Sequence, residues 1–195
     1  DQRSQRFIVM AMTCEGRSAT SQLVIAVSRT DDPLGAWAVY QVRSSFSPPL
    51  TTQTWFDFPS IALTDSDIFV TANLFDDAFS YRQAVVVQIN KEPLINGTAT
   101  TSSDIRSYLS LADDPYALFP VAVGNENEQS MLAITNGFGN DEANAIRIYE
   151  FEGALREGTP RVDVSTVSVP TFEPPGFSAQ PGSTVILTCF DQRGS

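Results

Sequence analysis

Short apolar runs of strand length recur along the chain, and polar turns separate them. The stretch from Trp55 to Asn90 contains three such runs, which predict successive β-strands at 60–64, 68–75 and 84–89. A helical turn is expected directly after the third strand, at 91–94. Comparable runs predict further strands at 6–14, 21–28, 36–42, 119–123, 131–136, 145–151, 161–169 and 183–190.

The pattern within three segments adds detail. The block 23–27 is apolar at odd and even positions alike, so we expect neighbouring layers to cover its strand on both faces. The segment 105–111 fits two interpretations. One is a helix with apolar residues along one side and Ser103 as its N-cap, and the other is an edge strand. We choose the strand, because the repeat described next requires one there. The alternation in 161–169 is typical of a strand near an outer edge.

The strand pattern repeats after about 60 residues. Phe58-Pro59 recurs 61 positions later as Phe119-Pro120, and the strand end Asn73-x-Phe75 recurs 63 positions later as Asn136-x-Phe138. A period in this range indicates an array of similar units rather than one mixed core. The two ends also match, since Asp-Gln-Arg at 1–3 comes before a strand and Asp-Gln-Arg at 191–193 follows one.

These repeats predict an all-β chain that is a β-propeller segment of four-stranded antiparallel blades. If Asp-Gln-Arg forms the turn between the first and second strands of a blade, the segment starts and ends at that turn. The blades then occupy 6–43, 59–109 and 119–169, and a fourth begins at 184–190. A two-sheet β-sandwich is the alternative, but it would show no such repeat.

Three blades cannot close a ring. We therefore expect the chain to be part of a larger propeller, with the remainder of the propeller as its main partner. Its first and last blades should each expose an apolar face. Made alone, the chain should aggregate or form oligomers.

Composition excludes several function classes. The chain has 12 Lys and Arg against 23 Asp and Glu, and its net charge of −11 disfavours binding to nucleic acid or to anionic membrane surfaces. No window approaches the ~20 apolar residues that a membrane span requires. The absence of histidine excludes Ser-His-Asp and Cys-His catalysis within this chain.

Several strings resemble those of secreted bacterial propeller proteins of the broad sialidase-like kind. They are RFIVMAMT, SQLVIAVSRTDDPLGAW, FDFPSIALTDSDIFVTANLF and VPTFEPPGFSAQPG. The resemblance implies a propeller fold and an extracellular or periplasmic location. Ser28-x-x-Asp31-x-x-x-Gly35-x-Trp37 is similar to a stretched Asp-box hairpin of that family. The usual box is tighter, and no arginine triad can be assigned, so sialidase activity is not implied.

Candidate binding residues gather where a propeller places its second-to-third-strand loops and its blade crossovers. Because those segments share one face, acidic and aromatic side chains should lie together there. The acidic residues are Glu15, Asp76, Asp77, Asp113, Asp114, Asp141 and Glu142, and the aromatic residues are Trp55, Phe56, Phe79, Tyr81, Tyr116 and Phe172. Aromatic rings beside carboxylates suit a sugar ring, or a cation held by oxygens.

Within this set we expect a ligand to contact Trp55, Asp57, Asp76, Asp77, Phe79, Tyr81, Asp141 and Glu142, and a Ca²⁺ ion to use Asp76 and Asp77. The alternative is that these acidic side chains are solvent-exposed turn residues that bind no ligand. Asp57 should lie where the first strand of its blade enters the central channel. Its alternative role is an Asx turn before Pro59.

The function favoured by these observations is binding of a glycan, a protein or a cation by an extracellular or periplasmic propeller. The alternative is a carbohydrate-active hydrolase with two carboxylates at the channel mouth. Cys14 and Cys189 should lie on opposite faces and three blades apart, too far for a disulfide, so we expect two free or externally paired thiols.

Overall fold

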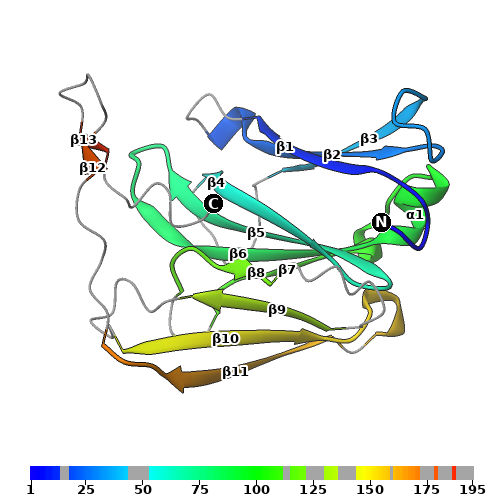
Figure 1. The fold of residues 1–195 in the computed structure, drawn as a ribbon. Helices are drawn as coiled ribbons and strands as arrows, with labels where there is room; N and C mark the ends of the chain where they lie inside the picture. Colours follow the sequence, from blue (N-terminus) through cyan, green and yellow to red (C-terminus); the bar gives the residue numbers. More distant parts are fainter. Residues whose placement is uncertain are drawn as a thin grey trace.

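The computed structural model describes residues 1–13, 18–43, 53–111, 115–121, 130–135, 144–158 and 160–171, and the backbone of 178–179 and 186–187. This part of the chain is all-β apart from one short α-helix and three 3₁₀ turns. Its main feature is a stack of three antiparallel sheets, which follow one another in chain order (Figure 1).

Each of the three sheets keeps its strands in sequence order. The first contains β1 (Ile8–Thr13), β2 (Gln22–Ser28) and β3 (Trp37–Arg43). The second contains β4 (Thr54–Leu63), β5 (Asp67–Asp76), β6 (Tyr81–Asn90) and β7 (Ile105–Tyr108). The third contains β8 (Phe119–Pro120), β9 (Ser130–Thr135), β10 (Ala145–Glu152) and β11 (Arg161–Ser168). A separate two-stranded sheet pairs β12 (Ser178–Ala179) with β13 (Ile186–Leu187).

Two hydrophobic cores hold the stack together. The core between the first and second sheets includes Leu23, Ile25, Ile68, Val70, Val87 and Ile89. The core between the second and third includes Phe69, Val86, Ala133, Tyr149 and Phe151. Neighbouring residues of β5 therefore point into different cores, as strand alternation requires. The middle sheet is covered on both of its faces.

The first sheet differs from its expected environment. Leu23, Ile25 and Val27 of β2 are buried, but Val24 and Ala26 are only partly covered. Within the described part of the chain β2 is therefore covered on one face only, as expected for the first sheet of an incomplete array, and a covering layer on its other face stays a prediction. A run of apolar residues in the sequence shows that both faces of its strand are apolar, but it does not show which segment covers the second face.

Strand β4 begins at Thr54, six residues before the predicted start. Its pairing with β5 shifts between Asp57 and Ser60, which is a β-bulge at Phe58-Pro59. Pro59 has no backbone N–H to donate, and bulges and edge strands are the positions in a sheet that tolerate this. The predicted strand begins after the proline, at 60, whereas the observed strand runs through it.

The other ambiguous segments follow the sequence-based choice. The segment predicted as an edge strand at 105–111 contains β7, and the helical turn expected at 91–94 is α1 (Lys91–Asn96). Thr101 and Asp104, rather than Ser103, organise the start of the 3₁₀ turn η2 (Ser102–Asp104), where the Asp104 carboxylate accepts a bond of 2.8 Å from the Thr101 N–H.

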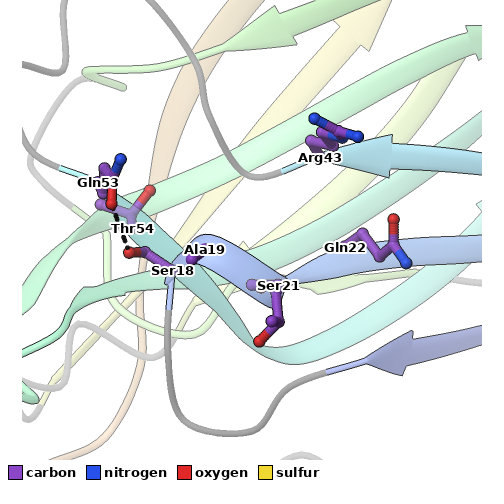
Figure 2. A pocket seen from close by; sticks show the side chains of 8 residues that line it. Ser18, Ala19, Ser21, Gln22, Arg43, Gln53 and Thr54 are labelled. Carbon is purple, nitrogen blue, oxygen red and sulfur yellow. Dashed lines mark hydrogen bonds between the residues drawn. The ribbon is translucent and has the colours of Figure 1, made fainter.

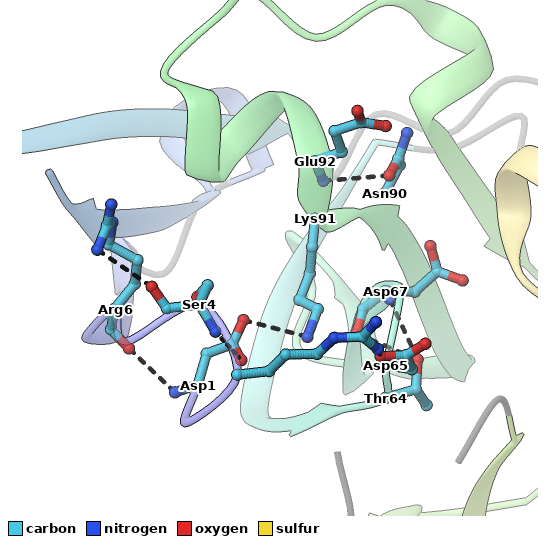
Figure 3. A network of polar contacts seen from close by, with 10 residues as sticks. Asp1, Ser4, Arg6, Thr64, Asp65, Asp67, Asn90, Lys91 and Glu92 are labelled. Carbon is cyan, nitrogen blue, oxygen red and sulfur yellow. Dashed lines mark hydrogen bonds and ion pairs between the residues drawn. The ribbon is translucent and has the colours of Figure 1, made fainter. Parts of the chain in front are cut away.

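Helix α1 closes one end of the first core. The Asn90 side chain caps its first turn by accepting from the Glu92 N–H at 3.1 Å, and Leu94 is buried in the core. Figure 3 shows the neighbouring ion pair, in which the buried Lys91 ammonium lies 3.1 Å from the Asp1 carboxylate. This pair connects the turn before β1 to the start of α1, directly after β6.

A buried polar network joins the second and third sheets at the same end. One Asp67 oxygen accepts bonds from the Gln88 side chain at 2.7 Å and from the Leu155 N–H at 3.0 Å. Gln88 also donates to the Gly153 carbonyl at 2.9 Å and accepts from the Tyr108 hydroxyl. Burial raises the pKa of Asp67 above its ordinary value, although the bonds from Gln88 and Leu155 oppose that rise. Burial likewise raises the pKa of Tyr108 to about 12.

The Asp67→Asn substitution tests this network through the pH dependence of stability. Because the pKa of Asp67 is raised in the folded state, folding favours its protonated form. Its contribution to the free energy of unfolding is therefore complete below the ordinary pKa of 3.8 and decreases as pH rises through the raised value. Urea unfolding from pH 3.5 to 7 should show that the variant lacks this decrease. Asp31→Asn, in an exposed turn, is the matched control and should keep the wild-type profile. An unchanged profile in Asp67→Asn would contradict the assignment.

Candidate functional site

The predicted binding residues that the structure describes lie at the end of the stack opposite α1 (Figure 1). Strand alternation and pairing bring them together, since β4 begins there and the hairpin between β5 and β6 turns there. Trp55 is paired with Phe75, and Phe75 is paired with Tyr81, so the three rings lie side by side across adjacent strands.

Five aromatic rings form a continuous row, which we call the aromatic ladder. Trp55 stacks on Phe75 with centroids 5.2 Å apart, and Tyr81 meets Phe75 edge-on at 5.8 Å. The row extends through edge contacts from Trp55 to Phe79 at 5.7 Å and from Tyr81 to Tyr116 at 5.0 Å. Two hydrogen bonds fix it, from the Trp55 indole N–H to the Asp76 carbonyl at 2.8 Å and from the Tyr81 hydroxyl to the Pro115 carbonyl. The ladder is therefore a preorganised apolar surface.

Phe79 is the most exposed ring of the ladder, with 67% of its surface accessible. It lies in the β5–β6 hairpin loop, where its N–H donates to the Asp76 carbonyl at 2.9 Å, and its φ is 60°. That conformation is common for glycine and rare for a bulky side chain. The position combines backbone strain with an exposed aromatic ring, and this combination suggests a role other than folding.

Asp76 organises the hairpin that carries Phe79. One of its oxygens accepts from the Ala78 and Ser80 N–H groups, both at 2.9 Å, and the other accepts from the Arg82 guanidinium. The bond from Ser80, followed by that from Arg82, lowers the pKa of Asp76 below its ordinary value. The carboxylate thus has a structural task in the turn, as the alternative interpretation of these acids expected.

Asp77 connects the hairpin to the first sheet. Its two oxygens accept from the N–H of Ser18 at 2.7 Å and from the Ser18 hydroxyl at 2.9 Å. The same hydroxyl lies 3.2 Å from the side-chain oxygen of Gln53. Because a hydroxyl has one proton, it can donate to only one of these acceptors, and a flipped Gln53 amide would donate to it instead.

A polar cleft of about 430 Å³ opens beside this connection, between the first sheet and the start of β4. Figure 2 shows its lining, in which Ser18 and Gln53 face each other. The other lining residues are Ala19, Thr20, Ser21, Gln22, Arg43 and Thr54. Arg43 is exposed and forms no salt bridge with another described residue. Since Thr54 and Trp55 are consecutive in a strand, the cleft and the ladder flank opposite faces of β4.

Asp57 lies in β4 at the edge of the bulge. It is half-buried and paired with Asn73, whose side-chain oxygen accepts from the Ala117 N–H at 3.0 Å. The ladder residue Trp55 is two positions away, so the two side chains share a face of the strand.

Several predicted residues lie outside the described part of the chain. They are Glu15, Asp113, Asp114, Asp141, Glu142, Phe172 and both cysteines, Cys14 and Cys189. The convergence of acids from consecutive hairpins and the state of the thiols remain predictions. Within the described ranges, no group of three or more His, Cys, Asp or Glu side chains is arranged to hold a metal ion. None of the helices described there is long and apolar enough to cross a membrane.

Phe75 and the residues that line the cleft were not predicted as binding residues from the sequence. Phe75 could have been found, because the alternation in β4, β5 and β6 places it between Trp55 and Tyr81. The cleft residues carry no sequence signal, since Ser18 and Asp77 are 59 positions apart and meet only when two sheets pack.

Comparison with known proteins found no matching family model, and no curated protein or solved structure with significant similarity to this chain. The site must therefore be interpreted from its own geometry.

Substitutions of Phe79 test the strain in the hairpin. Phe79→Ala removes the ring but keeps an unfavourable positive φ, whereas Phe79→Gly removes both. We expect Phe79→Gly to be more stable than Phe79→Ala by about 0.5–1 kcal/mol in urea unfolding. The order should reverse at Val39, an exposed position of β3, where glycine should be less stable than alanine. If the Gly and Ala variants had the same order of stability at both positions, the backbone strain at Phe79 would be contradicted.

Proposed function

We propose that this chain is a segment of a β-propeller and acts as an extracellular or periplasmic binding module. Three observations support the propeller. The sheets follow the chain in order, each has its strands in sequence, and successive sheets pack face to face through apolar cores. The sequence repeat of about 60 residues supports the same arrangement.

The ligand that best suits the site is a glycan. The aromatic ladder offers flat apolar surface for the faces of sugar rings, and the side chains of the adjoining cleft offer hydrogen bonds for hydroxyl groups. The observation that carries this proposal is Phe79, an exposed ring held in a conformation that suits glycine. The resemblance to sialidase-like propellers is compatible with a carbohydrate ligand.

A glycan is favoured over a cation because of how the nearby acids are used. Both oxygens of Asp76 and both of Asp77 already accept hydrogen bonds from the protein. A Ca²⁺ ion would have to displace these donors to be bound by both carboxylates. Binding of calcium or of a protein stays a prediction, and the contacts of this site support it less than they support a glycan.

Glycan binding is tested by screening residues 1–195 against an array of neutral and acidic oligosaccharides, followed by calorimetric titration with the best ligand. Phe79→Gly should weaken that ligand by at least ~5-fold, because it removes the outermost ring while relieving strain. Leu34→Gly removes an exposed apolar side chain from the β2–β3 turn and is the matched control. Equal affinity of both variants and the wild type would contradict the role of the ladder.

The hydrolase alternative requires two carboxylates about 5–9 Å apart that act on the sugar. Asp57 is the candidate among the described residues because the sequence predicts it at the channel mouth, and Asp76 and Asp77 have structural roles in the hairpin. We expect no turnover of chromogenic glycosides by the wild type or by Asp57→Asn. Turnover that disappears in Asp57→Asn would favour a hydrolase instead.

A further inference from the structure

The polar cleft beside the Phe79 hairpin has one charged group among the described residues that line it. That group is the guanidinium of Arg43, and the other lining residues are neutral. Its positive charge contrasts with the net charge of −11 of the whole chain. Since a few polar or charged groups in a cleft decide which ligand it accepts, this cleft favours an anionic group over a cation.

Arg43 also differs from the other described arginines in having no partner in the described part of the chain. It forms no hydrogen bond, ion pair or ring contact there. In the others, Arg3 pairs with Asp65, Arg82 with Asp76, Arg156 with Glu92 and Arg161 with Glu152, Arg6 and Arg29 donate to backbone carbonyls, Arg106 lies over the Tyr108 ring, and Arg147 is buried with interactions of its own. The N–H donors of Arg43 are therefore available to a ligand.

Gln22 is the neighbour of Arg43 in the first sheet. β2 begins with Gln22, β3 ends with Arg43, and the two residues are in register, so their side chains lie side by side at the cleft (Figure 2). The side-chain amide of Gln22 likewise forms no hydrogen bond with the described residues. A guanidinium and an amide together offer several N–H donors to one small anionic group.

We propose that this cleft binds the carboxylate of a uronic acid, so that the glycan is an acidic one. A carboxylate is planar and has two acceptor oxygens, which match the fork of an arginine side chain. The net charge of −11 repels a polyanion, and for that reason we expect one acidic unit among neutral sugars. The proposal rests on the proposed glycan ligand and assigns the cleft its acidic unit.

The position and size of the cleft fit one unit of a glycan that also contacts the aromatic ladder. Thr54 lines the cleft, and the next residue, Trp55, belongs to the ladder. The lining residue Ser18 is bonded to Asp77 in the hairpin that carries Phe79. The cleft volume of about 430 Å³ lies within the range of about 300–1,000 Å³ that is typical of small-molecule sites.

Saturation-transfer NMR of residues 1–195 tests the proposal, because it measures weak binding of small sugars even to an oligomeric protein. The probes are methyl glucuronoside and methyl galacturonoside, each compared with the neutral methyl glucoside or methyl galactoside. At least one uronoside should bind about 3–5-fold more tightly than its neutral counterpart, the size expected for an exposed ion pair. Arg43→Gln should abolish this difference.

Arg156→Gln is the matched control, since it removes the same charge at the opposite end of the stack, where Arg156 pairs with Glu92. This variant should keep the wild-type preference for the uronoside. Equal binding within both pairs of sugars, no binding of either uronoside, or a preference that persists in Arg43→Gln would overturn the proposal.

A carboxylate without a sugar ring separates a uronic acid from an acidic peptide. N-acetylglutamate should bind the wild type more weakly than the preferred uronoside does. Equal affinity would assign the cleft to an acidic peptide and overturn the acidic sugar. The ladder is tested separately, by Phe79→Gly with neutral oligosaccharides, so failure of the acidic subsite and failure of the proposed function give different results.

Discussion

The middle sheet has two apolar faces, and both must be removed from water at once. Ile68 and Val70 of β5 point to one side and Phe69 to the other, so a single covering layer would leave half of these side chains exposed. Full burial of such a side chain contributes about 1.5–3 kcal/mol. This requirement fixes the first and third sheets against the second, and every other feature of the molecule follows from their position.

The two ends of the stack are built from different interactions. At the end with α1, charged and polar groups are buried and paired, as in the Lys91–Asp1 ion pair and the Asp67–Gln88 network. Removing one partner there would leave a buried charge or dipole without compensation. At the opposite end the contacts are aromatic rings and turn hydrogen bonds, and Phe79 is exposed. Buried polar pairs join the sheets at the first end, whereas the second end combines the Ser18–Asp77 contact with an exposed aromatic surface.

The sequence was sufficient for most strands of the three main sheets, because alternation and a repeat of about 60 residues are local or periodic signals. It also placed Trp55, Phe79 and Tyr81 at one end. It did not predict β12, which lies in the proline-rich segment and pairs with β13 in a separate sheet. It did not reveal the bulge at Phe58-Pro59, since a proline is a stronger local signal for a turn before a strand than for a bulge within one. The contact between Ser18 and Asp77 was equally inaccessible, because two sheets must pack before these residues meet.

The shape of the aromatic ladder also affects how a ligand would be bound. Its five rings form a continuous row rather than a closed pocket, so successive sugar units of one glycan could each contact a ring. Once one unit is bound, the next binds at the effective concentration set by the linkage between the two sugars. Weak binding by each ring then becomes strong binding by the row. An exposed aromatic surface that binds single sugars weakly is therefore compatible with a specific partner, provided that the partner is a polymer.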